Sequence, residues 1–161
     1  MQVSDVMSKA IHAVSPLTTY EEVVRVMEEG LTSAVPVVDQ EEALVGIVSE
    51  KDLFRALYPD YSDYFVNPGA YNDQDTRAAR VAQLRNRPVS EFMTKDVETV
   101  TPDMPLMIAG GHMIAHRIHA LPVLGSERAL VGMISREQVF REVLVEKLDQ
   151  IEESANEPLK E

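Results

Sequence analysis

The residues best suited to bind a ligand lie where a predicted strand runs into a predicted helix, in Gly46-Ile-Val-Ser49-Glu-Lys-Asp52. Free backbone N–H groups and the positive end of the helix dipole favour an anion at a helix start. The Ser49 hydroxyl can donate to a phosphate, and Asp52, one turn on, can accept from both hydroxyls of a ribose. Gly46 lets a neighbour approach the backbone closely. The same residues also fit a structural role, with Ser49 as the N-cap and Asp52 as a first-turn acid.

A second group of polar residues is basic and lies in His116-Arg-Ile-His119-Ala-Leu-Pro-Val123. Arg117 is a possible phosphate donor, because its guanidinium is always charged and fork-shaped. The alternative is a helix end whose solvated basic residues offset the dipole. His112 and His116 are four residues apart, with His119 close behind, and zinc accepts such ligands. No carboxylate stands at the spacing of the helical zinc proteases, so we predict no metal site.

The chain contains an internal repeat at an offset of 86 residues. Val3 to Arg55 aligns with Val89 to Arg141 without a gap, and 18 of these 53 pairs are identical. Chance does not produce an ungapped match of that length, so the halves are two copies of one unit. The copies differ at one position of interest, because Gln138 stands where the first copy has Asp52.

The elements that must position these residues follow the order β-α-β-β-α in each copy. A lead-in with Val3 and Met7, or Val89 and Met93, precedes a short extended piece, a helix, two strands and a second helix. We predict the extended pieces at 11–14 and 97–100 and the first copy's strands at 35–38 and 44–48, joined by a polar turn at 39–42.

Capping residues and apolar spacing define the helices. Thr18 or Thr19 caps the first helix with Glu21 or Glu22 three residues on, while Asp103 caps its counterpart, with Pro105 in the first turn. Ser49 caps the helix that follows the two strands. The predicted buried side of the first helix consists of Tyr20, Val23, Val24, Met27 and Leu31, and that of the helix after Ser49 of Leu53, Phe54 and Leu57.

We divide the chain into a first repeat at 1–58, a connector at 59–88, a second repeat at 89–147 and an acidic tail at 148–161. The connector holds a helix-like run over 75–86 and the aromatic residues Tyr61, Tyr64, Phe65 and Tyr71. These aromatic residues either cover exposed apolar surface or form a ligand lid or partner surface. The tail is expected to fray.

Composition excludes several functional classes. The formal net charge of -12 argues against nucleic acid, and no apolar run is long enough to span a membrane. There is no cysteine for disulfides or thiolate chemistry. The N-terminus lacks a signal-peptide pattern, so we expect a cytoplasmic protein. We predict no enzymatic activity, because the nucleophile-elbow and phosphate-loop motifs are absent and Gly110-Gly111 falls inside a helix pattern.

The repeated order of Val and Met, Pro-Val after a short helix, and Gly-x-x-Ser before a last helix resembles the CBS domain family in its paired form, the Bateman module. The resemblance covers residues 3–57 and 89–146. It implies an α+β (mixed α/β) fold of two pseudo-symmetric β-α-β-β-α repeats packed through their sheets, with two ligand clefts. Members often form homodimers, and many bind AMP, ADP, ATP or S-adenosylmethionine and alter an attached or separate effector protein.

The resemblance also implies roles for individual residues. Ser49 and Asp52 match the phosphate- and ribose-binding pair, while Gln138 weakens the second copy's site because it has no anionic oxygens. His119 matches a basic residue that reaches the ligand phosphate. If the pseudo-twofold axis brings the two clefts close, His119 and Arg117 can reach across to a nucleotide held by Asp52. The remaining predicted ligand-binding residues are Ser8, Lys9, Ile11, Val35, Pro36, Gly46, Arg117, Leu121, Pro122, Ser135 and Arg136.

From these assignments we predict a nucleotide sensor with one good site and one degraded site. The acidic net charge leads us to expect AMP or ADP to bind better than ATP. The alternative is a ligand-free protein-protein interaction or dimerisation module, which Gln138 and the acidic charge favour.

Overall fold

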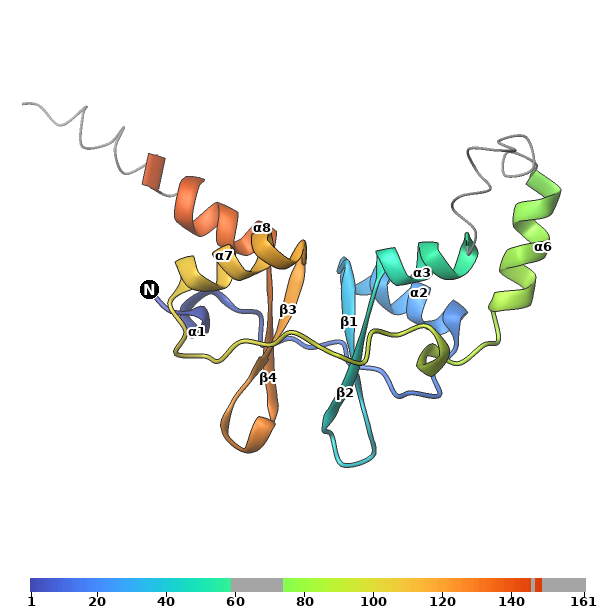
Figure 1. Ribbon diagram of the computed structural model, residues 1–161, viewed down its shortest axis with the longest axis horizontal. Coiled ribbons are helices and arrows are strands. Elements are labelled where there is room, and N and C mark those ends of the chain that lie inside the picture. Colours follow the sequence, from blue (N-terminus) through green and yellow to red (C-terminus); the bar gives the residue numbers. More distant parts are fainter. Residues whose placement is uncertain (59–73, 146, 149–161) are drawn as a thin grey trace, which may run out of the picture. The chain divides into compact units, whose positions relative to one another are not determined.

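The computed structural model describes residues 1–58, 74–145 and 147–148 (Figure 1). The chain has a mixed α/β arrangement, in which a helix precedes and a helix follows each pair of strands. The elements are α1 (Val3–Val6), α2 (Tyr20–Gly30), β1 (Ala34–Val38), β2 (Leu44–Ser49), α3 (Glu50–Leu57), α6 (Gln74–Leu84), η1 (Val89–Glu91), α7 (Leu106–His116), β3 (Ala120–Leu124), η2 (Ser126–Arg128), β4 (Leu130–Ser135), α8 (Arg136–Phe140) and the π-helical turn η3 (Arg141–Val145).

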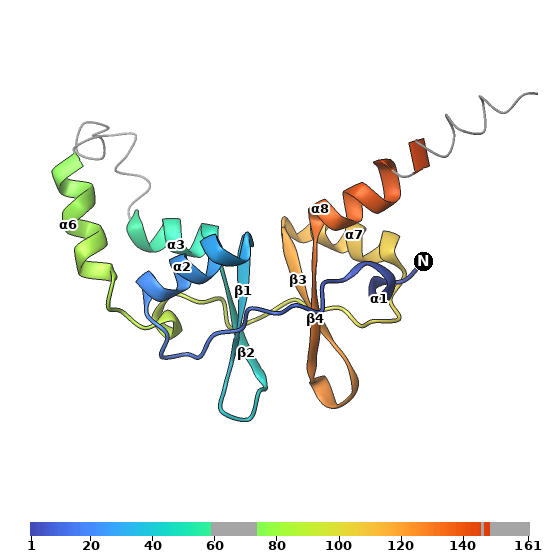
Figure 2. The same ribbon diagram turned by 180° about the vertical axis from the view of Figure 1, so that it is seen from behind.

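The chain forms two compact units, and each combines the lead-in of one repeat with the strands and helices of the other repeat. One unit consists of His12–Val97 and is called the β1–β2 unit. The other consists of Met1–Ile11 together with Glu98–Glu161 and is called the β3–β4 unit. The lead-in of the first repeat therefore packs on the body of the second, and the lead-in of the second packs on the body of the first. Figure 2 shows from behind how the chain after α6 passes α2 and reaches β2.

Each unit is built on an antiparallel strand pair of the same register. Ala34 pairs with Ser49 in the β1–β2 unit, and Ala120 pairs with Ser135 in the β3–β4 unit. The predicted extended pieces add one bridging residue each, Val14 beside β1 and Val100 beside β3, both parallel. The repeat seen in the sequence is thus a repeat of backbone pairing.

The N-terminus of α2 confirms the predicted capping box. Thr19 is the N-cap, its backbone N–H donates to Glu22 Oε2 at 2.8 Å, and the Glu22 N–H donates to Thr19 Oγ1 at 3.3 Å. The predicted cap of the second copy is wrong, because α7 begins after Pro105 rather than after Asp103. Pro105 supplies a fixed φ but no side-chain acceptor, and Asp103 instead bonds Thr101, which lowers the pKa of its carboxyl group.

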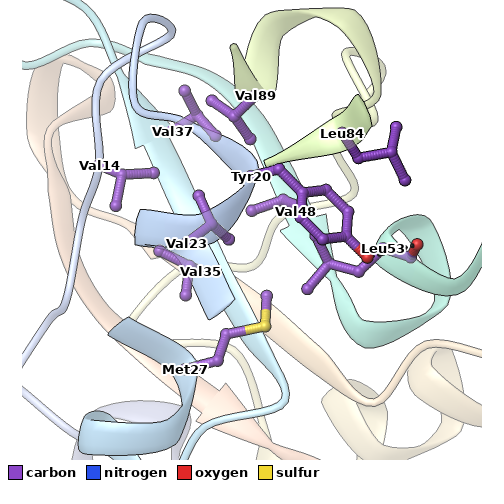
Figure 3. Packing of buried hydrophobic residues seen from close by; sticks show 10 residues of the cluster. All are labelled: Val14, Tyr20, Val23, Met27, Val35, Val37, Val48, Leu53, Leu84 and Val89. Atoms are coloured by element: carbon purple, nitrogen blue, oxygen red, sulfur yellow. Dashed lines mark hydrogen bonds between the residues drawn. The ribbon is translucent and has the colours of Figure 1, made fainter. Parts of the chain in front are cut away.

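Each unit has its own hydrophobic core. Figure 3 shows the core of the β1–β2 unit, in which Val23, Val35 and Val48 are fully buried. Lead-in residues belong to these cores, because Val89 is fully buried in the β1–β2 unit and Val3 in the β3–β4 unit. The Tyr20 hydroxyl donates to the Leu53 carbonyl at 3.1 Å and so ties α2 to α3.

Three residues predicted on buried helix faces are exposed. The exposed fraction is 39% for Val24, 94% for Leu31 and 62% for Phe54. Leu31 lies past the end of α2 as its left-handed C-cap, which turns its side chain out of the helical stripe. Val24 lies beside the buried face of α2, and Phe54 lies beside the buried face of α3. Each of the two helices therefore keeps an apolar side chain on its outer surface.

The connector is described only from Gln74 onward. Its helix α6 confirms the predicted helical run, begins one residue earlier and ends at Leu84, which is buried in the core of the β1–β2 unit. The aromatic residues Tyr61, Tyr64, Phe65 and Tyr71 and the acidic tail lie outside the described residues. Among the helices of the described residues, none combines the length and the apolar character that crossing a membrane requires.

Candidate functional site

Ser49 and Asp52 meet at the junction of β2 and α3, as the sequence predicts. Asp52 Oδ2 accepts hydrogen bonds from the Ser49 backbone N–H at 2.9 Å and from the Ser49 hydroxyl at 2.7 Å. The Asp52 side chain is only 6% exposed. The structural role of this pair is therefore present, since it holds the first turn of α3.

Asp52 Oδ1 faces the lead-in of the second repeat. Among the described residues it accepts a single hydrogen bond, from the Thr94 hydroxyl, at 3.3 Å. A carboxylate oxygen has two lone pairs, so this atom keeps capacity for a further donor. Sequence reasoning missed Thr94, because only the exchange of lead-ins brings it to Asp52.

Gly46 serves the close approach that the sequence predicts, and the neighbour is the lead-in. A Cβ atom at Gly46 would lie 2.5 Å from Met93 Sδ and 3.1 Å from the Thr94 carbonyl oxygen. The backbones of Ile47 and Thr94 exchange two hydrogen bonds, both of 2.9 Å, at this crossing. The Gly46 side of the junction is therefore filled by protein.

The second copy repeats this junction with a different side chain. Gln138 Oε1 accepts from the Ser135 backbone N–H at 2.8 Å, as Asp52 does from Ser49. The Gln138 amide nitrogen then donates to the Val6 carbonyl at 3.3 Å. Gln138 thus replaces the carboxylate by a group that both caps α8 and holds the lead-in.

The basic residues His119 and Arg136 lie together in the β3–β4 unit. Arg136 Nη2 is 2.8 Å from His119 Nδ1, and the Arg136 backbone N–H donates to the His119 carbonyl at 2.8 Å. A guanidinium only donates, so the His119 nitrogen in this contact is an acceptor. An anion at this corner therefore meets the permanent charge of Arg136. Arg117 is the exposed left-handed C-cap of α7 and makes no hydrogen bond to either side chain among the described residues.

A comparison with known families decides what these paired units are. The profile of the CBS domain matches residues 3–59 and 89–145. The chain belongs to the CBS domain family. The matched segments start at the two lead-ins, and each ends at or just beyond the last helical turn described for its repeat.

Relatives of this CBS pair include longer proteins. Homoserine O-acetyltransferase of Methanococcoides burtonii is 30% identical over 139 residues, which are 86% of this chain and 23% of that protein. The chain therefore spans less than a quarter of that relative's length.

Two solved structures share the fold. The CBS domain pair of protein MJ0100, in complex with 5'-methylthioadenosine and S-adenosyl-L-methionine, superposes with a TM-score of 0.71, at 22% identity over 91% of this chain and 98% of that one. CBSX2 of Arabidopsis thaliana in complex with AMP superposes with a TM-score of 0.69, at 23% identity over 91% and 98%.

The other predicted ligand residues of this CBS pair lie on the strands and lead-ins. Val35 and Leu121 are fully buried in the two cores, and Pro36 and Pro122 follow them on β1 and β3. The backbone N–H and C=O of Ser8 are both hydrogen-bonded to the backbone of Met133. The neighbouring Lys9 is exposed and is therefore the more accessible residue of this lead-in. Ile11 is half-buried at the boundary of the β3–β4 unit.

Proposed function

We propose that this CBS pair is a cytoplasmic regulatory module that binds an adenine nucleotide or S-adenosylmethionine and performs no catalysis of its own. The observation that carries the proposal is the β2–α3 junction, where a buried carboxylate at a helix N-terminus keeps acceptor capacity on Asp52 Oδ1. That group suits ribose hydroxyls, because each hydroxyl can donate its proton to a carboxylate oxygen. The AMP and S-adenosyl-L-methionine complexes of the two similar structures support this ligand class.

In this proposal the two copies of the repeat differ in their capacity to bind a ribose. Asp52 offers charged acceptor oxygens, whereas the side-chain amide of Gln138 is already hydrogen-bonded to the backbone of Val6 and Ser135. We therefore propose one strong ribose site, at Asp52. His119 and Arg136, which lie together in the β3–β4 unit, suit a phosphate group, and the net charge of -12 favours AMP or ADP over ATP.

Thermal unfolding of the full chain with AMP, ADP, ATP or S-adenosylmethionine tests the proposal. A ligand at about 100 times its Kd adds about 2.7 kcal/mol, which raises the Tm of a protein this size by roughly 5–10 °C. No rise with any of the four at millimolar concentration would leave the ligand-free interaction module as the function.

Matched variants locate the binding residues. Asp52→Asn keeps an oxygen for Ser49 but removes the charge, and we expect it to cost about 1.5–3 kcal/mol of nucleotide binding. Gln138→Ala should leave that affinity nearly unchanged. Arg136→Gln tests the basic corner of the β3–β4 unit. It should weaken the binding of nucleotides and leave the binding of S-adenosylmethionine unaffected, because that ligand has no phosphate. Equal losses in Asp52→Asn and Gln138→Ala would refute the assignment of the strong site.

The apolar outer surface of the helices supports a homodimer. Val24 and Phe54 line a hollow of about 310 Å³ on the β1–β2 unit, together with Tyr20 and Met27. Phe140, the counterpart of Phe54, is also exposed, at 56%. Because both units show the same exposed aromatic residue, we propose that a second copy of the chain covers these faces. Light scattering after size exclusion should give a dimer for the wild type and a monomer for Phe54→Ser/Phe140→Ser.

A further inference from the structure

Three side chains able to bind a metal come together at helix α7 of the β3–β4 unit. His112 and His116 lie on successive turns, with ring centroids 4.5 Å apart. Glu98 comes from the segment that precedes the Val100 bridge and lies against both imidazoles. One ligand atom from each of the three residues lies within 4.8 Å of the other two. Sequence spacing could not reveal this group, because Glu98 stands 14 residues before His112.

The distances within this group fit an ion better than direct bonding. Glu98 Oε2 is 3.7 Å from His112 Nε2, and Glu98 Oε1 is 3.6 Å from His116 Nδ1. Both separations are too long for hydrogen bonds. Ligand atoms around a tetrahedral ion with bonds of about 2.0–2.2 Å lie about 3.3–3.6 Å apart. Small side-chain rotations therefore suffice to place all three atoms on one ion.

The donor set selects the kind of ion. Two imidazole nitrogens and one carboxylate oxygen suit zinc and its neighbours among the transition metals, whereas Mg²⁺ and Ca²⁺ prefer oxygen ligands. The carboxylate offsets part of the ion's charge, and the net charge of -12 attracts cations to the molecule. We propose that Glu98, His112 and His116 form a binding site for Zn²⁺ or a similar transition-metal ion, with one coordination position open to water.

The first repeat shows that the fold does not require this group. Its counterparts of Glu98, His112 and His116 are His12, Val26 and Gly30, at the same offset of 86. Position 12 still touches position 30, since a Cβ atom at Gly30 would lie 3.0 Å from the His12 ring. The same backbone therefore brings these positions together in both units, and only the β3–β4 unit carries three ligands there.

The surroundings of the metal site determine its affinity for the ion and the segments that a bound ion would connect. His112 Nδ1 is buried and has no hydrogen-bond partner among the described residues. A ligating imidazole normally donates from its second nitrogen, and lack of that partner lowers affinity by about 10–100-fold. We expect a reversible site rather than a structural one. A bound ion would join the last turn of α7, which leads directly into Arg117 and His119, to the strand segment at Val100.

Calorimetric titration of the tag-free full chain with ZnCl₂ tests the site. We expect one Zn²⁺ per chain, no binding of MgCl₂, and at least about tenfold weaker zinc binding in Glu98→Gln and in His116→Gln. His12→Gln, at the counterpart of Glu98, is the control and should bind zinc as the wild type does. Zinc should also raise the Tm of the wild type and of His12→Gln equally, and that of Glu98→Gln by less at the same zinc concentration.

Zinc-free Tm values separate loss of the site from loss of the fold, and these exposed substitutions should leave them nearly unchanged. The proposal is overturned if the wild type binds no zinc up to millimolar concentration. It is also overturned if His119→Gln abolishes binding while Glu98→Gln does not.

Discussion

At the scale of single residues, Asp52 does two things at once. Its carboxylate holds the Ser49 N–H and hydroxyl at the start of α3 and also receives the Thr94 hydroxyl. We therefore predict that Asp52→Asn lowers the free energy of unfolding by about 0.5–2 kcal/mol, even without ligand. Urea denaturation measures this. Glu50→Gln, an exposed acid in the same turn, is the control and should change stability by less than about 0.5 kcal/mol.

Two glycines give a second prediction at this scale, with opposite signs. A Cβ atom at Gly46 would meet Met93 Sδ at 2.5 Å, whereas one at Gly111 in α7 would meet nothing within 4 Å. Gly46→Ala should cost about 1–3 kcal/mol by overpacking the lead-in crossing. Gly111→Ala should add about 0.5–1 kcal/mol, because alanine favours the helix. Equal effects in urea denaturation would show that the crossing is not tightly packed.

At the scale of elements, the capping box of α2 predicts that the stability of the folded protein depends on pH. Hydrogen bonds from the Thr19 backbone N–H and hydroxyl lower the pKa of the Glu22 carboxyl below its usual value. The folded state therefore favours the ionised form. Glu22 adds stability above its unfolded pKa, and this contribution is lost as the pH falls through the lower folded pKa.

The comparison of wild type with Glu22→Gln measures this contribution. We expect the wild type to have the higher urea midpoint at pH 7 and the difference to shrink toward pH 3. A difference that stays constant over this range would assign the effect to side-chain shape rather than to charge.

Which elements the sequence can predict depends on how local their causes are. The Thr19 cap and the strands of both repeats depend on neighbouring residues, so their pattern predicts them. The exposure of Phe54 and Leu31 does not follow from periodicity, because an apolar residue on a helix can face a core or a partner molecule. Pro105 replaced the expected Asp103 cap because its fixed φ suits the residue that precedes the helix.

The candidate sites divide in the same way. Ser49 and Asp52 are three residues apart on a strand–helix junction, so their contact is predictable. Thr94 and Glu98 reach their partners through pairing of distant segments, which no local pattern records. Gln138 is intermediate, since its cap is local but its bond to Val6 depends on the exchanged lead-in.

At the scale of the whole molecule, the exchange of lead-ins means that a repeat in sequence is not a unit in space. The β1–β2 unit needs Leu84 and Val89 in its core and Thr94 at its strand edge, and all three lie beyond residue 58. It is nevertheless one continuous stretch, His12–Val97. A fragment of residues 12–97 therefore contains every residue of this core, whereas a fragment of residues 1–58 leaves part of the same apolar surface uncovered.

We predict that the 12–97 fragment unfolds cooperatively in urea and that the 1–58 fragment shows no cooperative transition. The reason is that burial of apolar surface supplies most of the stabilising free energy, and Val89 is fully buried. Adding a separate peptide of residues 84–97 to the 1–58 fragment should restore a cooperative unfolding transition, because the peptide supplies the core side chains that the fragment lacks. Substituting Val89→Asp should abolish the transition of 12–97, because a carboxylate would then replace a core side chain without a partner. Cooperative unfolding of 1–58 alone would show that the first repeat closes its own core and that the lead-in from the second repeat is only an accessory.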